Sequence, residues 1–192
     1  MTKRLTTAFF LFLFNTLAIT HVYADGQAVD PSIRQLLTDA INSSDSFDDR
    51  FHAEVWLVDM SNRLQHFVKD EKTRLAMLKQ IHLEAARSEL QPELVLALIE
   101  VESHFDTYAI SKSGAQGMMQ IMPFWLDEIG RPDDNLIDMK TNLRMGCTIL
   151  KYYMDMEKND LHKALARYNG SAGSKVYSNK VLTALHDHWY QS

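Results

Sequence analysis

The 192-residue chain is short of the features that carry many common chemistries. Its one cysteine, Cys147, cannot form an internal disulfide, and the apolar residues around it predict a buried thiol in a helix core, not a nucleophile. Glycine-rich phosphate loops and Ser-His-Asp nucleophile signatures are absent. The eight histidines are scattered, and His186-Asp187-His188 lacks a further ligand at a metal-like spacing. We therefore predict no metal and no cofactor, and a surface position for these C-terminal histidines.

The chain also has fewer basic than acidic residues, 20 against 25. The formal net charge is −5 at pH 7. Loss of residues 1–24 would make it more negative, because Lys3 and Arg4 would go and no acidic residue would. A negative chain does not attract polyanions. Nucleic acid and an anionic membrane are therefore excluded as main partners.

The chain lacks an uninterrupted apolar run of the ~20 residues that a membrane-spanning helix needs. Residues 1–24 have instead a positively charged start, an interrupted apolar middle and the small-residue site Val22-Tyr23-Ala24. This pattern is typical of an export signal. We expect cleavage near Ala24, a periplasmic mature chain and no stable membrane anchor, with an uncleaved anchor as the alternative.

No stretch alternates polar and apolar residues for long enough to predict a strand, whereas helical spacing recurs along most of the chain. The prediction is a predominantly all-α protein with one domain. Residues 25–48 form a polar leader, and helices within 49–90 pack beside a main domain at 91–190. Asp70, Asp138 and Asp160 are predicted to cap helices that follow them.

One carboxylate, Glu102, lies in unusual surroundings. Pro92 suits the first position of a helix, and a strongly apolar run, 94–99, follows it. At about 3.6 residues per turn, Glu102 falls on the apolar face of this helix and Glu100 faces away from it. Because an ionised carboxylate is disfavoured in apolar surroundings, we expect the pKa of Glu102 to rise toward neutrality. Glu102 is thus predicted to donate a proton at neutral pH.

The residues after this helix predict a turn that comes back toward Glu102. Ser111-Lys112-Ser113-Gly114 is a turn-prone cluster, and it leads into Gly117-Met118-Met119-Gln120. Small hydroxyls, a thioether and an amide should therefore lie near the carboxylate. Further along, Ala166-Arg167-Tyr168-Asn169-Gly170 ends with a pair that is typical of a helix C-terminus.

These three blocks, beginning with Glu102-Ser103, resemble in order and spacing the catalytic domain of the soluble lytic transglycosylases, relatives of goose-type lysozyme. The resemblance covers about 92–190 and implies a lysozyme-like fold. It also implies cleavage of the β-1,4 bond between N-acetylmuramic acid and N-acetylglucosamine in peptidoglycan. Glu102 would act first as the acid and then as the base on the muramyl C6 hydroxyl, which closes a 1,6-anhydro ring. One carboxylate can suffice, because the attacking group then belongs to the substrate.

The resemblance also assigns roles to six other residues, and for all of them except Gln120 a purely structural role is the alternative. Ser111, Ser113 and Gln120 would hold the sugar and its N-acetyl group, although the serines are also ordinary turn residues. Met119 would line the pocket wall. Tyr168 would approach the catalytic region, and Asn169, otherwise a helix terminator, would brace it. Ser103 is expected to bond nearby backbone, and the segment 171–177 is given no role.

Two other functions remain open at this stage. A hydrolytic lysozyme of the same fold would use water in place of the C6 hydroxyl. A non-catalytic wall-binding module, for instance one tied to a secretion apparatus, would bind glycan strands without cutting them. Peptidoglycan is the expected partner in all three cases, and the sequence does not distinguish cleavage at chain ends from internal cleavage.

Overall fold

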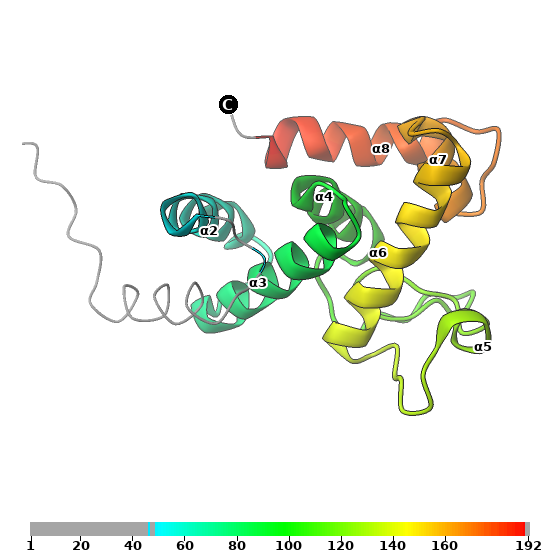
Figure 1. The fold of residues 1–192 in the computed structure, drawn as a ribbon, viewed down its shortest axis with the longest axis horizontal. Helices are drawn as coiled ribbons and strands as arrows, with labels where there is room; N and C mark the ends of the chain where they lie inside the picture. Colours follow the sequence, from blue (N-terminus) through cyan, green and yellow to red (C-terminus); the bar gives the residue numbers. More distant parts are fainter. Residues whose placement is uncertain (1–45, 47–48, 191–192) are drawn as a thin grey trace, which may run out of the picture.

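The computed structural model describes Ser46 and residues 49–190 (Figure 1). The expected signal peptide over 1–24 lies outside the described residues, and so does the polar leader over 25–48 apart from Ser46. The described chain folds into helices α2 (Arg50–Leu64), α3 (Glu71–Arg87), α4 (Pro92–Ser103), α5 (Trp125–Ile129), α6 (Met139–Met156), α7 (Leu161–Tyr168) and α8 (Val176–Ala184), followed by the π-helical turn η1 (Leu185–Trp189). Within this part of the chain, β-structure is limited to two isolated bridges. The all-α prediction is confirmed.

Short-range capping sets where most of these helices begin. Asp49, Asp70, Asp138 and Asp160 each accept a hydrogen bond from the backbone N–H three residues later, at the starts of α2, α3, α6 and α7. Pro92 occupies the first turn of α4, where its missing N–H costs nothing. The predicted caps and the predicted start at Pro92 are confirmed.

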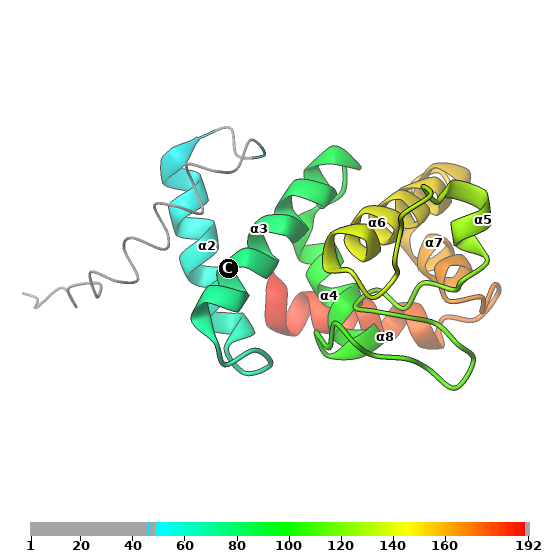
Figure 2. The same cartoon turned by 90° about the horizontal axis from the view of Figure 1, so that it is seen from below.

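Helix α4 lies at the centre of the molecule. Its residues 94–99 are all buried, because α3 packs against one side of the helix and α8 with η1 against another. Figures 1 and 2 show α2 at one end of the molecule and α5, α6 and α7 at the other. None of the described helices is long and apolar enough to cross a membrane.

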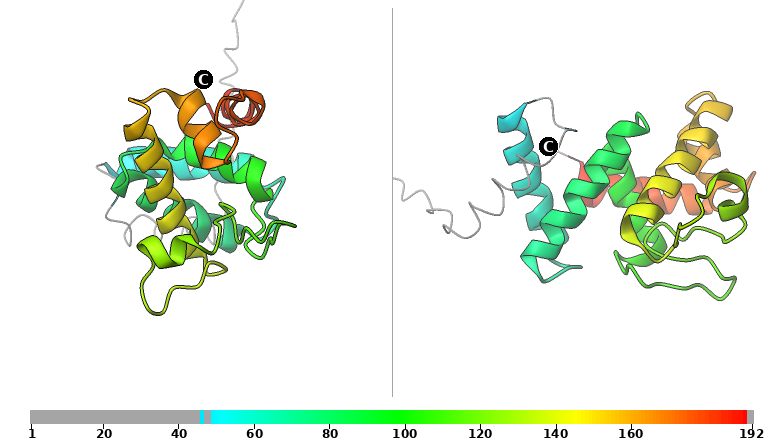
Figure 3. Two further views of the ribbon diagram at one scale, coloured as in Figure 1. Left: turned by 90° about the vertical axis from the view of Figure 1, so that its right-hand side faces the viewer. Right: turned by 60° about the horizontal axis from the view of Figure 1, so that its bottom comes forward.

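The N-terminal helices share the core with the rest of the described chain. Buried side chains of α2 and α3, including Leu57, Leu64 and Leu78, belong to the same apolar cluster as those of α4 and α6. Arg63 of α2 also donates to the carbonyl oxygens of His188 (2.9 Å) and Tyr190 (3.2 Å). The second view of Figure 3 shows α2 beside the C-terminal end of the described chain.

The core of α6 is as the sequence predicted. Cys147 is fully buried there, and this burial raises the pKa of its thiol far above the usual value. A buried thiol that keeps its proton is no nucleophile. The predicted structural position of Cys147 is confirmed.

Glu100 corrects one sequence-based expectation. It was expected to face away from the apolar side of α4, but its side chain is only 11% exposed. Trp189 Nε1 donates to its Oε2 at 2.7 Å, and His188 Nδ1 lies 2.8 Å from its Oε1. The C-terminal turn covers this face of α4. Helical periodicity cannot predict a contact between residues so far apart in the sequence. His186 and His188 are themselves exposed, which confirms the surface position predicted for these histidines.

Candidate active site

Glu102 lies in the last turn of α4 and is partly buried. Burial raises the pKa of its carboxyl from 4.5 to about 7, and a hydrogen bond from Tyr177 opposes that rise. Near neutral pH, the protonated and ionised forms are therefore both well populated. A carboxyl in this state can give a proton and take one back.

Tyr177 is the partner of this carboxyl. Its hydroxyl donates to Glu102 Oε1 at 2.5 Å, and its ring is buried in the first turn of α8. Burial and the neighbouring charge of Glu102 raise the pKa of Tyr177 well above its ordinary value. Tyr177 therefore keeps its proton and acts only as a donor toward Glu102. Sequence analysis missed this residue, because the segment 171–177 received no role.

The loop after α4 carries the predicted turn, and Asn142 of α6 holds it in place. Asn142, only 1% exposed, accepts from Met119 N at 2.7 Å and donates to the carbonyl oxygens of Gln116 (2.9 Å) and Leu136 (2.8 Å). Gly117 has a φ of +75°, and a Cβ there would lie 2.3 Å from Asn142 Nδ2. Glycine is thus required for this close approach. Asn142 was not predicted, since nothing near it in sequence marks it as a partner of the turn.

The structure brings Tyr168 and Met119 together, although not as expected. The Tyr168 hydroxyl donates to the Met119 carbonyl oxygen at 2.8 Å. The Met119 side chain is fully buried and packs on Gly146, where a Cβ would lie 2.3 Å from its sulfur atom. Met119 therefore does not line an open pocket with its thioether, contrary to expectation, because a glycine in α6 leaves room for it in the core. Ser103 Oγ donates to the Met118 carbonyl oxygen at 2.7 Å, which confirms the backbone contact expected of Ser103.

The remaining predicted residues all make local hydrogen bonds. Ser111 Oγ lies 3.0 Å from Ser113 Oγ and accepts from Ala115 N at 3.0 Å. Gln120 Nε2 donates to the carbonyl oxygens of Ala109 (3.2 Å) and Gly117 (2.9 Å). These bonds brace the loop that follows Glu102.

Asn169 stands apart from that loop, at the end of α7. It is exposed, occupies the C-cap position and donates to Ser171 Oγ at 3.1 Å. Gly170 follows with a φ of +71°, as a helix C-terminus favours. In the described part of the chain, no group of three or more His, Cys, Asp or Glu side chains is placed to hold a metal ion.

Residues 79–183 match the family model of the transglycosylase SLT domain. The chain belongs to this family. The match begins inside α3 and ends inside α8, so it includes Glu102, Tyr168 and Tyr177. The resemblance noted from the sequence motifs is thereby confirmed.

Two relatives show how much of its sequence this chain shares with members of the family. The chain is 27% identical over 143 residues to membrane-bound lytic murein transglycosylase C of Photorhabdus laumondii, which is 65% of this chain and 39% of that protein. It is 30% identical over 106 residues to the protein of the same name from Yersinia pestis, or 47% of this chain and 30% of that protein. The chain thus spans less than half the length of these relatives.

A solved structure shares the fold. The X-ray structure of an inactive mutant of lytic transglycosylase Slt from Pseudomonas aeruginosa matches with a TM-score of 0.51 at 17% sequence identity. The match covers 82% of this chain and 36% of that one. The lysozyme-like helical fold that the motifs implied is therefore confirmed.

Proposed function

We propose that the protein is a lytic transglycosylase that cleaves the β-1,4 bond between N-acetylmuramic acid and N-acetylglucosamine in peptidoglycan, with Glu102 as its sole acid and base. Membership of the transglycosylase SLT domain family supports the reaction class. The observation that carries the proposal is the partly buried carboxyl of Glu102, whose pKa of about 7 suits both halves of such a reaction.

In the first step, protonated Glu102 gives its proton to the glycosidic oxygen as the bond from that oxygen to the muramyl C1 breaks. The N-acetylglucosamine end leaves as an alcohol, and Glu102 becomes a carboxylate. Tyr177 donates to Oε1 of this carboxylate and so stabilises the charge at the moment when it forms. Burial has the opposite effect, because it raises the pKa of Glu102. A larger fraction of Glu102 is then protonated at neutral pH and able to act as the acid.

In the second step, the Glu102 carboxylate takes the proton of the muramyl C6 hydroxyl while O6 bonds to C1. The product is a 1,6-anhydro ring, and Glu102 is again protonated. No water is consumed. The attack is intramolecular, so it avoids the entropy cost of bringing in a second molecule.

The other predicted residues would support this chemistry from the loop and from α7. We propose that Ser111, Ser113 and Gln120 contact the sugar and its N-acetyl group, with Ser113 the most exposed of them. Met119 contributes through its backbone, which Tyr168 fixes by the bond to the carbonyl oxygen. Asn169 ends α7 and thereby orients the segment that leads to Tyr177.

Mass spectrometry of the products tests the proposal directly. Purified full-length protein is incubated with cell-wall sacculi, and the released fragments are weighed. We expect fragments that end in 1,6-anhydromuramyl groups. Ends that are heavier by one water would instead identify a hydrolytic lysozyme, and binding to sacculi without release of fragments would identify a non-catalytic module. Either result would overturn the proposal.

The proposed place of action is the periplasm, after export and removal of residues 1–24. The support is the signal-like sequence that ends at Ala24. N-terminal sequencing of the protein recovered from a periplasmic extract should give Asp25 as its first residue. Recovery of a chain that still begins at Met1, in the membrane fraction, would contradict this location.

A further inference from the structure

The turn that ends α4 has an unusual backbone. Two residues after Glu102, His104 has a φ of +52°, and the next residue, Phe105, has a φ of +66°. Residues other than glycine seldom adopt this left-handed conformation, and for a bulky side chain such as phenylalanine it is a marked outlier. Strain of this kind persists only where surrounding contacts hold it. Contacts from elsewhere in the molecule must therefore hold the turn beside Glu102.

Three aromatic rings pack together at this turn. Phe105 is buried, and its ring centroid lies 5.1 Å from that of Phe67 and 5.6 Å from that of Trp189. Phe67 and Trp189 also stack on each other, with their ring centroids 6.4 Å apart. Each ring thus contacts the other two. The Phe105 side chain is held from two sides, so its backbone is restrained as well.

Polar contacts hold Trp189 in place. Its indole N–H donates to Glu100 Oε2 at 2.7 Å, and its side chain is fully buried. Arg63 of α2 donates to the carbonyl oxygens of His188 and Tyr190, the residues on either side of Trp189. The position of the indole ring is therefore fixed by α2 and α4 together.

Both rings that contact Phe105 come from outside the matched family domain. The family model covers residues 79–183. Phe67 lies before this range, in the link between α2 and α3, and Trp189 lies after it, in η1. The two parts of the chain that flank the domain thus meet at the turn that follows Glu102.

The position of this turn affects the carboxyl of Glu102 directly. Glu102 lies in the last turn of α4, which ends at Ser103. The bond from Tyr177 to Glu102 Oε1 joins this last turn to α8. If the chain after Ser103 relaxed to ordinary φ values, the end of α4 would lose its support and the carboxyl would gain contact with water.

We propose that Phe67 and Trp189 are positioning residues for the carboxyl of Glu102. Through the ring of Phe105 they hold the strained turn, and the turn fixes where α4 ends and where Glu102 points. The effect on catalysis rests on the proposed function. The inference also gives the link between α2 and α3 a task in the active site, beyond completing the core.

The pKa of Glu102 tests this inference without any substrate. Full-length protein is isotope-labelled at its glutamate carboxyl groups, and NMR follows each group as the pH changes; Glu102→Gln identifies the signal of Glu102. The wild-type pKa should be about 7, because burial shields the carboxyl from water. In Phe67→Leu and in Trp189→Leu, water should reach the carboxyl, and the pKa should fall by roughly one unit or more toward 4.5.

The rate of fragment release from sacculi is the second readout. Phe67→Leu and Trp189→Leu should each lower it roughly tenfold, because the acid is misplaced. Adding His104→Gly to Phe67→Leu should restore part of the lost rate, since glycine adopts a positive φ without strain. His104 is exposed, and its ring contact with Phe67 is already absent in that background. A residue that only stabilised the fold would show no such rescue at a temperature where every variant is folded.

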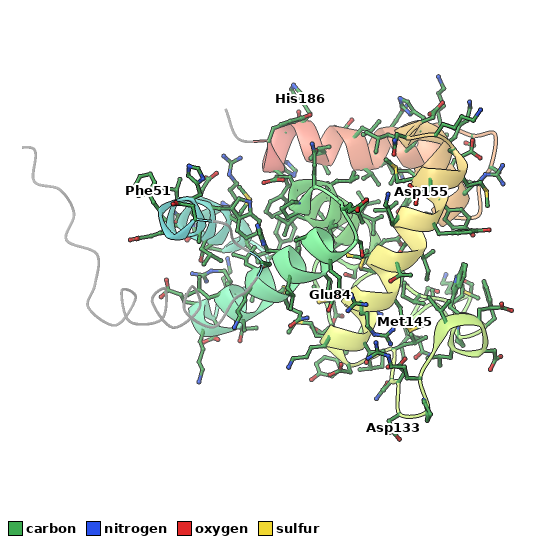
Figure 4. All side chains as sticks on the ribbon, viewed as in Figure 1. Phe51, Glu84, Asp133, Met145, Asp155 and His186 are labelled. Carbon is green, nitrogen blue, oxygen red and sulfur yellow. The ribbon has the colours of Figure 1, made fainter. Side chains whose placement is uncertain are left out.

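His186 supplies a matched control. It lies in the same C-terminal turn as Trp189, but its side chain is 80% exposed and points outward (Figure 4). His186→Ala should change neither the pKa of Glu102 nor the rate. Thermal unfolding shows the temperature range in which each variant is folded. If Trp189→Leu does not fold, Phe67→Leu decides, because the Phe67 ring is only partly buried.

The outcomes separate this inference from the proposed function. If the wild type releases no fragments, the proposed function fails, and the pKa of Glu102 in the variants still tests the two rings. If folded Phe67→Leu protein keeps the wild-type pKa and rate, the inference is wrong and the proposed function stands. A wild-type pKa already near 4.5, or a lost rate that His104→Gly does not restore at all, would also overturn the inference.

Discussion

The hydroxyl of Tyr177 donates to Oε1 of Glu102 at 2.5 Å, although the two residues are 75 positions apart in the sequence. Packing of α8 against α4 brings them together. Two opposing influences therefore meet on one carboxyl, because burial favours its protonated form and this hydrogen bond favours its ionised form. The balance sets the pH range in which the protonated and ionised forms of Glu102 are both populated, as the proposed mechanism requires.

Tyr177→Phe removes the bond that favours ionised Glu102. We expect kcat/KM to fall roughly tenfold to a hundredfold, as for loss of a hydrogen bond to a charged group. Because the acid must be protonated in the free enzyme, activity of the wild type should decline as the pH rises through about 7. In Tyr177→Phe the midpoint of this decline should move to higher pH. Tyr168→Phe is the control, because the Tyr168 hydroxyl donates to the Met119 carbonyl oxygen and not to Glu102; this variant should leave the midpoint unchanged. An unchanged midpoint in Tyr177→Phe would refute the role of Tyr177.

The pH dependence of stability should reveal the raised pKa of Glu102. Folded Glu102 binds its proton more tightly than the unfolded chain does, since its pKa rises from 4.5 to about 7. Its contribution to stability is thus fully present below pH 4.5 and is lost as the pH rises through about 7. Relative to wild type, Glu102→Gln should gain up to about 3 kcal/mol in unfolding free energy between pH 4.5 and 8.

Denaturant unfolding at these two pH values measures the difference. Glu128→Gln is the control, because Glu128 is exposed on α5, and it should follow the wild type at both values. A difference between Glu102→Gln and wild type that stays constant with pH would mean that Glu102 titrates normally in the folded protein.

Asn142→Ala should loosen the turn beside Glu102. The substitution leaves the buried N–H of Met119 and the carbonyl oxygen of Leu136 without their partner. It also removes one of the two hydrogen bonds that the Gln116 carbonyl oxygen accepts, the other of which comes from Ile121 N. We expect a loss of roughly 3 kcal/mol in unfolding free energy, and a fall in activity even at temperatures where the variant is fully folded. Thr148→Ala, which removes an exposed hydroxyl on the same helix, should change neither quantity appreciably. Normal activity in folded Asn142→Ala protein would show that the turn does not depend on this amide.

Gly146→Ala should push the Met119 side chain out of its place in the core. The new Cβ would lie 2.8 Å from Met119 Cβ as well as 2.3 Å from the sulfur. Such overpacking should cost about 1–3 kcal/mol of unfolding free energy, more than the gain of roughly 1 kcal/mol from replacing a helical glycine. In a Met119→Ala background the same substitution should cost less, because two of the three clashing atoms, the sulfur and Cε, are gone and only Cβ remains. Equal costs in both backgrounds would argue against this contact.

The parts of the fold that short-range chemistry determines could be predicted from the sequence. Asp70, Asp138 and Asp160 cap helices because their side chains bond to backbone three residues away. Glu102 could be found for a similar reason, since the periodicity of α4 places it beside apolar residues of the same helix. The family motifs then located the turn and the end of α7.

The parts that depend on distant contacts could not be predicted. Tyr177 is an ordinary aromatic residue until α8 packs on α4, and Asn142 is an ordinary helical amide until the loop after Glu102 reaches it. The burial of Glu100 depends on Trp189, 89 positions later. The Met119 side chain was misjudged for the same reason, because the gap that receives it comes from Gly146 on another helix.

The most direct test of the account is the release of fragments from purified sacculi by Glu102→Gln protein, compared with wild type at pH 7. Glutamine keeps the size of the side chain and can still accept the bond from Tyr177, but it has no acidic proton to give. The account predicts that wild type releases 1,6-anhydromuramyl fragments and that the variant does so about 10²–10⁴ times more slowly. Release at the wild-type rate by folded Glu102→Gln protein would contradict it.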